Sequence, residues 1–176
     1  MTDPLIRAFA WSDVPAITGI YRHYVEHSTA TFDTEAPSAT YMAEKFGHMV
    51  DLGHPVLSLE IDGALAGYAY ASVYRPRPAY RFTCEDSIYL APDLQGRGHG
   101  SLLLARLIEL SRLAGFRQML AVITSESAGS IALHRKFGFS PRGEFPSLGC
   151  KFDRWLAVTH MQLALEGAEA VASPVR

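Results

Sequence analysis

Hydrophobic positions along the chain follow two different periods. Between residues 101 and 114 apolar side chains recur every three or four positions, at Leu103, Leu107, Leu110 and Ala114, which predicts an amphipathic helix with one buried face. Elsewhere apolar residues alternate with polar ones or form short continuous runs, which is typical of strands. This reasoning predicts helices over residues 12–25, 101–114 and 127–137, and strands over residues 5–9, 56–61, 65–73, 82–90, 119–124 and 155–165.

The order of these elements favours an α/β fold. The strands at 56–61 and 65–73 are joined through Asp62-Gly63, a pair that suits the tight turn of a β-hairpin. Helices then alternate with strands, so we expect a single domain with a mixed central β-sheet flanked by helices. No Gly-x-Gly-x-x-Gly motif follows the first strand, which disfavours a dinucleotide-binding fold.

Composition and charge exclude several function classes. The 176 residues include 16 Lys and Arg against 18 Asp and Glu, so the chain lacks the basic excess that a nucleic-acid partner requires. No apolar run reaches the length of about 18 residues that indicates a membrane span, and the first residues do not resemble a signal peptide. Cys84 and Cys150 lie too far apart for a zinc ribbon, and His23 and His27 lack a third ligand nearby. We therefore expect a cytoplasmic protein that binds no nucleic acid, membrane or metal.

A glycine-rich loop joins the strand at 82–90 to the helix at 101–114. Gly96, Gly98 and Gly100 let the backbone turn tightly and keep side chains away from its N–H groups. With the positive end of the following helix dipole, these donors form a site for an anion such as a pyrophosphate. A plain strand-to-helix turn would not need glycines at this density.

The loop also carries a resemblance to a known family. The sequence Gln95-Gly96-Arg97-Gly98-His99-Gly100 matches the Q/R-x-x-G-x-G/A loop that binds the acetyl-CoA pyrophosphate in the GCN5-related N-acetyltransferases (GNAT). Residues 130–139, which end in Gly-Phe, are similar to the family's helix beside the coenzyme A arm. Within the family the chain most resembles the phosphinothricin and methionine sulfoximine acetyltransferases, through Thr31-Phe32, Tyr74-Arg75-Pro76, Tyr80-Arg81, residues 83–89 and residues 149–155.

This resemblance spans nearly the whole chain. The composition of the last ten residues predicts a flexible tail over 167–176. The resemblance implies the GNAT fold, with an N-acetyltransferase domain over residues 1–166. It also implies acetyl-CoA as the cosubstrate, a small amino-acid-like amine as the acceptor, no metal, and a homodimer.

The resemblance assigns residues to the cofactor as well. The backbone of the strand before the loop is implied to bind the pantetheine arm, and one of its N–H groups would polarise the thioester carbonyl. Ser127 stands where relatives often carry an asparagine. The implied cofactor contacts are Ile88, Tyr89, Leu90, Gln95, Gly96, Arg97, Gly98, His99, Gly100, Ser101 and Ser127.

Two residues are candidates for acid–base chemistry. An α-amine is mostly protonated at neutral pH, so acetyl transfer to it needs a base. Glu85 lies on the strand before the loop, at the position matching the subfamily's catalytic glutamate, where burial can raise the pKa of its carboxyl. Its alternative role is a surface ion pair with Arg75 or Arg81. His134 resembles the subfamily's histidine, and it either protonates the departing thiolate or packs as a locally hydrogen-bonded residue.

The acceptor site is predicted from charge. Arg75 and Arg81 flank an aromatic loop that leads to Glu85, and an arginine forks two hydrogen bonds onto a carboxylate. We therefore expect these arginines to bind the carboxylate of the acceptor. The candidate walls of the pocket are aromatic residues that could equally belong to the core: Phe32, Tyr80 and Trp155.

The arginine-rich approach to Glu85 favours an anionic or zwitterionic acceptor, because a polyamine or aminoglycoside site would be lined by carboxylates. The hypothesis is an acetyl-CoA-dependent N-acetyltransferase of small amino-acid-like amines that transfers the acetyl group directly. Two alternatives stay open: a GNAT enzyme acting on a polyamine, aminoglycoside or protein amine, and a non-catalytic module that senses acetyl-CoA. Lys151 is interpreted as a solvated charge rather than a second anion contact.

Overall fold

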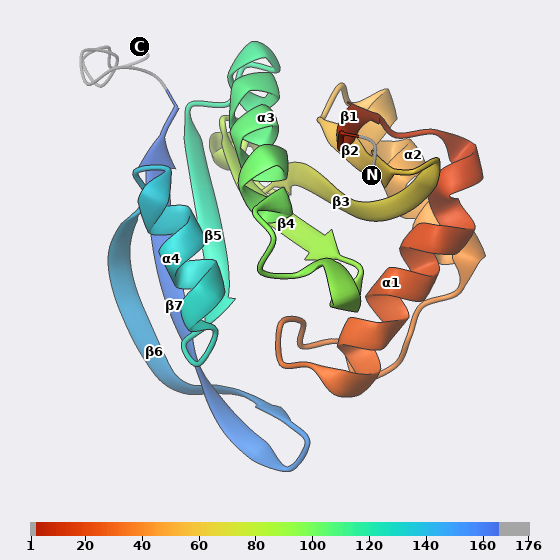
Figure 1. Ribbon diagram of the computed structural model, residues 1–176. Coiled ribbons are helices and arrows are strands. Elements are labelled where there is room, and N and C mark those ends of the chain that lie inside the picture. Colours follow the sequence, from red (N-terminus) through yellow and green to blue (C-terminus); the bar gives the residue numbers. More distant parts are fainter. Residues whose placement is uncertain (1–2, 166–176) are drawn as a thin grey trace.

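The protein is described by a computed structural model that covers residues 3–165 (Figure 1). Its centre is one seven-stranded sheet in the order β1-β2-β3-β4-β5-β7-β6, in which β4 and β5 pair in parallel and the other neighbours pair antiparallel. The strands are β1 (Leu5–Ala8), β2 (Val56–Ile61), β3 (Ala64–Val73), β4 (Thr83–Leu90), β5 (Gln118–Thr124), β6 (Ser140–Lys151) and β7 (Arg154–Ala164). The helices are α1 (Val14–His27), α2 (Ala39–Asp51), α3 (His99–Leu113) and α4 (Ala128–Lys136). The predicted α/β fold with a mixed sheet is confirmed.

Helices cover both faces of the sheet and build two hydrophobic cores (Figure 1). On one face α1 and α2 pack against aromatic residues of the sheet, with Ile17 and Phe46 fully buried beside Tyr68. On the other face α3 inserts the apolar stripe that its spacing predicted, and Leu103 and Leu107 are fully buried there. The sheet is therefore apolar on both sides, which is why its strands combine alternation with continuous apolar runs.

Two elements were missed by the sequence analysis. The helix α2 was not predicted, although its three buried apolar residues, Met42, Phe46 and Met49, recur at helical spacing. The strand β6 is an edge strand with most of its residues exposed, and it contains prolines and glycines that normally interrupt strands. Edge strands tolerate such residues because one side of their backbone makes no sheet hydrogen bonds. The predicted tail at 167–176 lies outside the described residues.

The pairing between β4 and β5 is short, and this positions the site. Their register runs from Thr83 opposite Gln118 to Glu85 opposite Leu120 and then stops. Both strands continue beyond that point, to Leu90 and Thr124, without pairing with each other, while β4 stays paired with β3 and β5 with β7. The sheet therefore splits into two halves, and Glu85 lies where the split begins.

Candidate functional site

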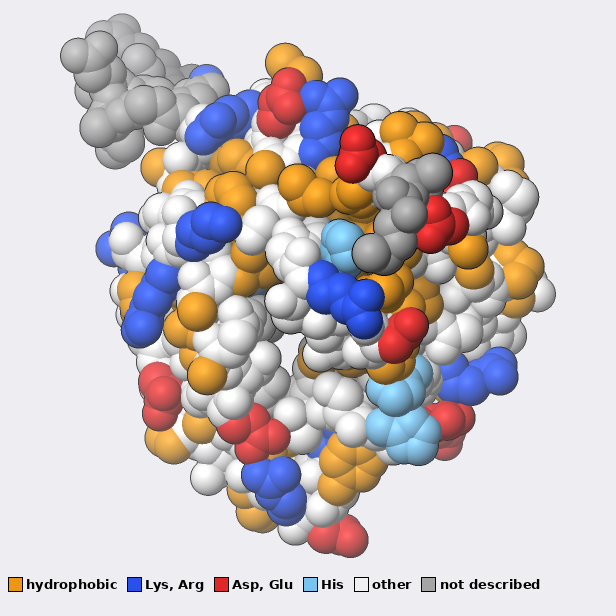
Figure 2. Space-filling view, in the orientation of Figure 1, with side chains coloured by type: hydrophobic (Ala, Val, Ile, Leu, Met, Phe, Trp, Pro, Cys, Tyr) orange, Lys and Arg blue, Asp and Glu red, His pale blue; other side chains and the backbone are white. Residues whose placement is uncertain are grey.

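The split of the sheet opens a cleft of about 1010 Å³. Its walls come from the parts of β4 and β5 that no longer pair with each other, the segment after α1, the glycine-rich loop before α3, and the first turns of α4. Figure 2 shows the surface hollowed between the side formed by α3 and α4 and the side formed by α1. The cleft is thus bounded by both halves of the sheet and by helices from both of its faces.

Two neighbouring acidic residues of β4 face opposite sides of the sheet, because side chains alternate along a strand. Glu85 shares its face with Tyr89, whose ring packs against Tyr21 and Tyr24 of α1. Asp86 points the other way and contacts His134 of α4. Both acidic residues line the cleft, so each face of the sheet contributes one carboxyl group to it.

Glu85 is half-buried, and its environment shifts its titration. Burial raises the pKa of its carboxyl above the ordinary 4.5, and the neighbouring Asp86 carboxylate raises it further. The cations Arg75 and Lys45 act in the opposite direction without cancelling the rise. A carboxyl group with a raised pKa at the edge of a cleft is suited to exchange protons near neutral pH.

Asp86 and His134 form a buried pair. The Nε2 atom of His134 lies 3.0 Å from Oδ2 of Asp86, and its Nδ1 lies 2.7 Å from the carbonyl oxygen of Ser130. Burial opposes the charged imidazolium, but the Asp86 carboxylate and the Ser130 carbonyl outweigh that effect, so the pKa of His134 is raised. Both ring nitrogens already have acceptors, which favours the locally hydrogen-bonded role of His134 over the role of a free acid.

The glycine-rich loop has the geometry that its sequence predicted. Gly96 and Gly98 adopt positive φ angles of 72° and 87°, and Gly98 forms the N-cap of α3. A Cβ at Gly100 would lie 3.3 Å from the Leu133 side chain, so the loop and α4 approach closely there. Gln95 donates a 2.9 Å hydrogen bond to the hydroxyl of Tyr24, which ties the loop to α1. The first-turn amides of α3 therefore face the cleft mouth without side chains between them and a ligand.

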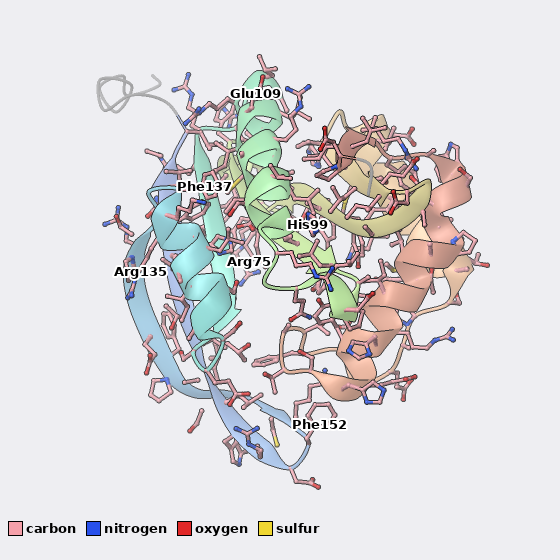
Figure 3. The ribbon with its side chains drawn as sticks, viewed as in Figure 1. Arg75, His99, Glu109, Arg135, Phe137 and Phe152 are labelled. Atoms are coloured by element: carbon pink, nitrogen blue, oxygen red, sulfur yellow. The ribbon has the colours of Figure 1, made fainter. Side chains whose placement is uncertain are left out.

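Most of the predicted cofactor contacts meet in this cleft. They are the β4 residues Ile88, Tyr89 and Leu90, the loop residues Gln95, Gly96, Gly98, Gly100 and Ser101, and Ser127 before α4. The structure does not place Arg97 or His99 among the lining residues; Figure 3 shows His99 at the start of α3. Glu85 and His134 line the same cleft, so the acid–base candidates and the phosphate-type loop share one site.

The predicted acceptor residues separate into two groups. Phe32 lines the cleft, whereas Arg75, Tyr80 and Arg81 do not. Arg75 stacks on Tyr74, whose ring packs edge-on against Tyr80. The positive charge of Arg75 also acts on the Glu85 carboxyl and lowers its pKa. Arg81 instead stacks on Phe82 and donates a hydrogen bond to the Pro78 carbonyl.

Two cations near the site, Lys45 and Lys151, and one acid that lines it, Asp86, were not predicted from the sequence. Lys45 of α2 donates a 2.9 Å hydrogen bond to the Tyr70 hydroxyl beside the cleft, and α2 itself was not predicted. Asp86 follows Glu85 directly in a predicted strand, so the alternation of side chains could have placed it on the opposite face of the sheet. The interpretation of Lys151 as a solvated charge is wrong, because its side chain is buried at 3% exposure. Trp155, a candidate wall, is 70% exposed on β7.

Metal binding and membrane insertion would each need a recognisable arrangement within residues 3–165. No group of three or more His, Cys, Asp or Glu side chains in this part of the chain could hold a metal ion. None of its helices is both long and apolar enough to cross a membrane.

Comparisons with known proteins agree with this geometry. Residues 17–139 match the model of the acetyltransferase (GNAT) family. The chain is 43% identical over 165 residues to a phosphinothricin N-acetyltransferase of Alcaligenes faecalis, covering 93% of this chain and 84% of that protein. It is 42% identical over 160 residues to an L-methionine sulfoximine/L-methionine sulfone acetyltransferase of Salmonella typhimurium, covering 88% and 91%. A solved phosphinothricin acetyltransferase from Sinorhizobium meliloti in complex with acetyl-CoA superposes with a TM-score of 0.94 at 40% identity, covering 99% of this chain and 95% of that one.

Proposed function

The chain belongs to the acetyltransferase (GNAT) family and is an acyltransferase, and from that premise we propose that it acetylates the amine of a small amino-acid-like molecule. The acyl donor is acetyl-CoA, and the acceptor is of the phosphinothricin, methionine sulfoximine or methionine sulfone type, as in the similar proteins named above. One observation carries the proposal: a carboxyl group with a raised pKa, that of Glu85, lines the same cleft as a helix N-terminus cleared of side chains.

The cofactor assignment rests on the loop and on β4. The amides that follow Gly98 are suited to the pyrophosphate, since they combine free donors with the positive end of the α3 dipole. Beyond Glu85 the backbone of β4 has no partner strand on its β5 side, so backbone groups there can bind the amides of the pantetheine arm. The Leu90 carbonyl is excluded from this set, because it accepts a 2.7 Å hydrogen bond from the Tyr24 hydroxyl. Ser127, at the start of α4, is retained as a further contact.

The proposed chemistry is direct transfer. Glu85 takes a proton from the ammonium of the acceptor, directly or through a water molecule, and the neutral amine then attacks the thioester carbonyl carbon. The tetrahedral intermediate collapses as the carbon–sulfur bond breaks, and sulfur keeps the electron pair. The second proton of the attacking nitrogen passes through water to the thiolate of coenzyme A, and Glu85 returns its proton to solvent. A backbone N–H of β4 stabilises the oxyanion. We assign His134 to the second of its two predicted roles, in which it holds Asp86 and shapes the cleft.

The acceptor's carboxylate is assigned to Arg75. The Arg75 charge reaches Glu85, so a zwitterion bound with its ammonium at Glu85 can place its carboxylate near this guanidinium. Phe32, which lines the cleft, and Tyr80, which packs on Tyr74 beside Arg75, are its proposed aromatic neighbours. Lys45 adds a further positive charge near the Glu85 carboxyl. This charge disfavours a polyamine or an aminoglycoside, two of the alternative acceptors.

The variant Glu85→Gln tests the proposal. We expect acetyl-CoA binding, measured by calorimetry, to survive, while turnover falls about a hundredfold or more, as for loss of a general base. Glu44→Gln, on an exposed position of α2, is the matched control and should behave like the parent. Unchanged turnover in Glu85→Gln would remove Glu85 from its role. A parent chain that binds acetyl-CoA but releases coenzyme A with no amine of a broad panel would support the sensing module instead.

A homodimer is part of the proposal. Exposed apolar side chains gather on the hairpin formed by β6 and β7, and contiguous exposed patches of this kind mark protein interfaces. They are Phe145, Leu148, Phe152 and Trp155. Light scattering should give twice the mass of one chain, and Trp155→Glu should reduce it to a monomer.

The proposed location is the cytoplasm. Cys84 and Cys150 are both free thiols, one buried and one exposed, and unpaired cysteines suit a reducing compartment. Fractionation of cells that express the chain would test this location, because an enzyme found outside the cytoplasm would contradict it.

A further inference from the structure

The segment of residues 28–33, which we call the strap, forms a wall of the cleft between the end of α1 and the loop before α4. Its first five residues all line the cleft. The hydroxyl of Thr124 donates a 2.9 Å hydrogen bond to the carbonyl of Thr29, whose own hydroxyl donates to Glu126 at 2.8 Å. The strap therefore bridges the two halves of the split sheet on the side where Glu85 meets the acceptor.

Lys151, more than a hundred residues away in the sequence, binds the strap through hydrogen bonds. It ends β6, and its buried ammonium donates to the carbonyls of Tyr24 at 3.3 Å, Ser28 at 2.7 Å and Thr31 at 2.8 Å. An ammonium group has three N–H donors, so all of them are used on backbone oxygens. The position is also favourable for a cation because the carbonyls at the end of α1 carry the negative end of its dipole. Burying a charged ammonium group costs free energy, and the three hydrogen bonds offset part of that cost.

Gly149 contacts the same segment, and its lack of a side chain leaves room for Phe32. A Cβ at this position would overlap the ring of Phe32, so the aromatic side chain lies directly against the β6 backbone. Gly149 and Lys151 are two residues apart on one strand and therefore face the same side, toward the strap. Cys150, between them, is exposed on the opposite side. Figure 3 shows Phe152, which follows Lys151, at the tip of the hairpin formed by β6 and β7, beside the end of α1.

We propose that Gly149 and Lys151 are positioning residues that hold the strap across the cleft and thereby determine which acceptors fit beside Glu85. Lys151 fixes the backbone of the strap, and Gly149 leaves room for the Phe32 ring to form the acceptor wall. The proposal rests on the proposed function, because it assigns the strap to the acceptor rather than to acetyl-CoA. Residues 149–151 belong to a stretch that resembles the family but had no assigned role. The proposal assigns Gly149 and Lys151 to the selection of the acceptor.

Steady-state kinetics of Gly149→Ala test the acceptor assignment. Displacement of the Phe32 ring should raise the KM for the amino-acid acceptor about tenfold, comparable to a misfit of one or two methylene groups, and leave the KM for acetyl-CoA nearly unchanged. In Phe32→Ala the ring is absent, so adding Gly149→Ala to that variant should have little further effect. The matched control is Cys150→Ala, which alters the outer side of the same strand. Equal rises in both KM values, or independent effects of the two substitutions, would overturn the proposal.

Hydrogen–deuterium exchange of Lys151→Met tests the strap without any substrate. Loss of three hydrogen bonds should speed exchange in residues 28–33 and leave α3, on the other face of the sheet, unchanged. Exchange in the strap equal to that of the parent would overturn the positioning role, whatever the kinetics show. If the parent acetylates no amine, the proposed function fails, and this exchange result alone decides whether Lys151 holds the strap. If the parent is active but Gly149→Ala keeps its acceptor KM, only the selection role fails.

Discussion

His134 of α4 and Asp86 of β4 share a single proton in the hydrogen bond between them. The carbonyl of Ser130 can only accept, so the Nδ1 atom of His134 must carry a hydrogen, and one further proton lies between Nε2 and Oδ2 of Asp86. The other carboxylate oxygen, Oδ1, is buried and has no hydrogen-bond partner within residues 3–165. These surroundings favour the protonated imidazole of His134 by raising its pKa, so the contribution of the pair to stability depends on pH.

Asp86→Asn should cost more stability in mild acid than in mild base. Because the pKa of His134 is raised above 6.5 in the folded chain, its stabilisation is complete below that value and is lost as pH rises through the folded pKa. We expect urea unfolding to show a loss of about 3 kcal/mol near pH 6, and a smaller loss near pH 9, where a neutral histidine can accept from asparagine. In His134→Gln the pH dependence of the Asp86→Asn effect should disappear. An equal loss at both pH values would mean that His134 is not charged in the folded chain.

The acid limb of the pH–rate profile should report Glu85. A general base must be ionised, so kcat/KM falls as pH drops through its pKa, which burial raises above 4.5. Arg75 lowers that pKa by stabilising the carboxylate, and Arg75→Gln should therefore move the acid limb to higher pH. Arg81→Gln is the control, since Arg81 stacks on Phe82. A limb that stays in place or moves to lower pH in Arg75→Gln would contradict the assignment.

Local patterns in the sequence predicted the parts of the site that depend on neighbouring residues. The loop from Gln95 to Gly100 could be predicted because glycine spacing, strand and helix follow one another along the chain. Glu85 was expected through the resemblance, at the position that matches the subfamily's catalytic glutamate on the strand that enters the same loop, and its role stays a prediction. The geometry of the loop is formed by neighbouring residues, so short-range rules of backbone conformation suffice for it.

Contacts between distant parts of the chain were not accessible in this way. Asp86 and His134 are 48 positions apart, and Lys151 meets the strap carbonyl of Thr31 at a separation of 120. A buried lysine and a surface lysine look the same in sequence, because burial depends on which segments pack around the residue. The same limit explains the edge strand β6, whose prolines and glycines are compatible with a strand only because it lies at the border of the sheet.

Gly98→Ala should weaken acetyl-CoA binding. Gly98 has a φ of 87° at the N-cap of α3, and an alanine in this left-handed conformation costs roughly 1 to 2 kcal/mol or shifts the loop. We expect the KM for acetyl-CoA to rise several-fold while the KM of the acceptor stays close to that of the parent. Gly19→Ala, in the middle of α1 with open space around its Cβ position, is the control and should stabilise the chain by about 0.5 to 1 kcal/mol. Normal acetyl-CoA kinetics in Gly98→Ala would remove the loop from the cofactor site.

Arg75→Ala and Arg81→Ala should differ, although the sequence treats the two arginines alike. Arg75 acts on Glu85, whereas Arg81 is held against Phe82 and the Pro78 carbonyl. Losing a hydrogen bond between a guanidinium and a carboxylate should raise the KM of the acceptor about tenfold or more in Arg75→Ala. The KM for acetyl-CoA should not change, since the loop before α3 is untouched. An acceptor lacking its carboxylate should bind both the parent and Arg75→Ala equally weakly, and a large effect of Arg81→Ala alone would transfer the carboxylate site to Arg81.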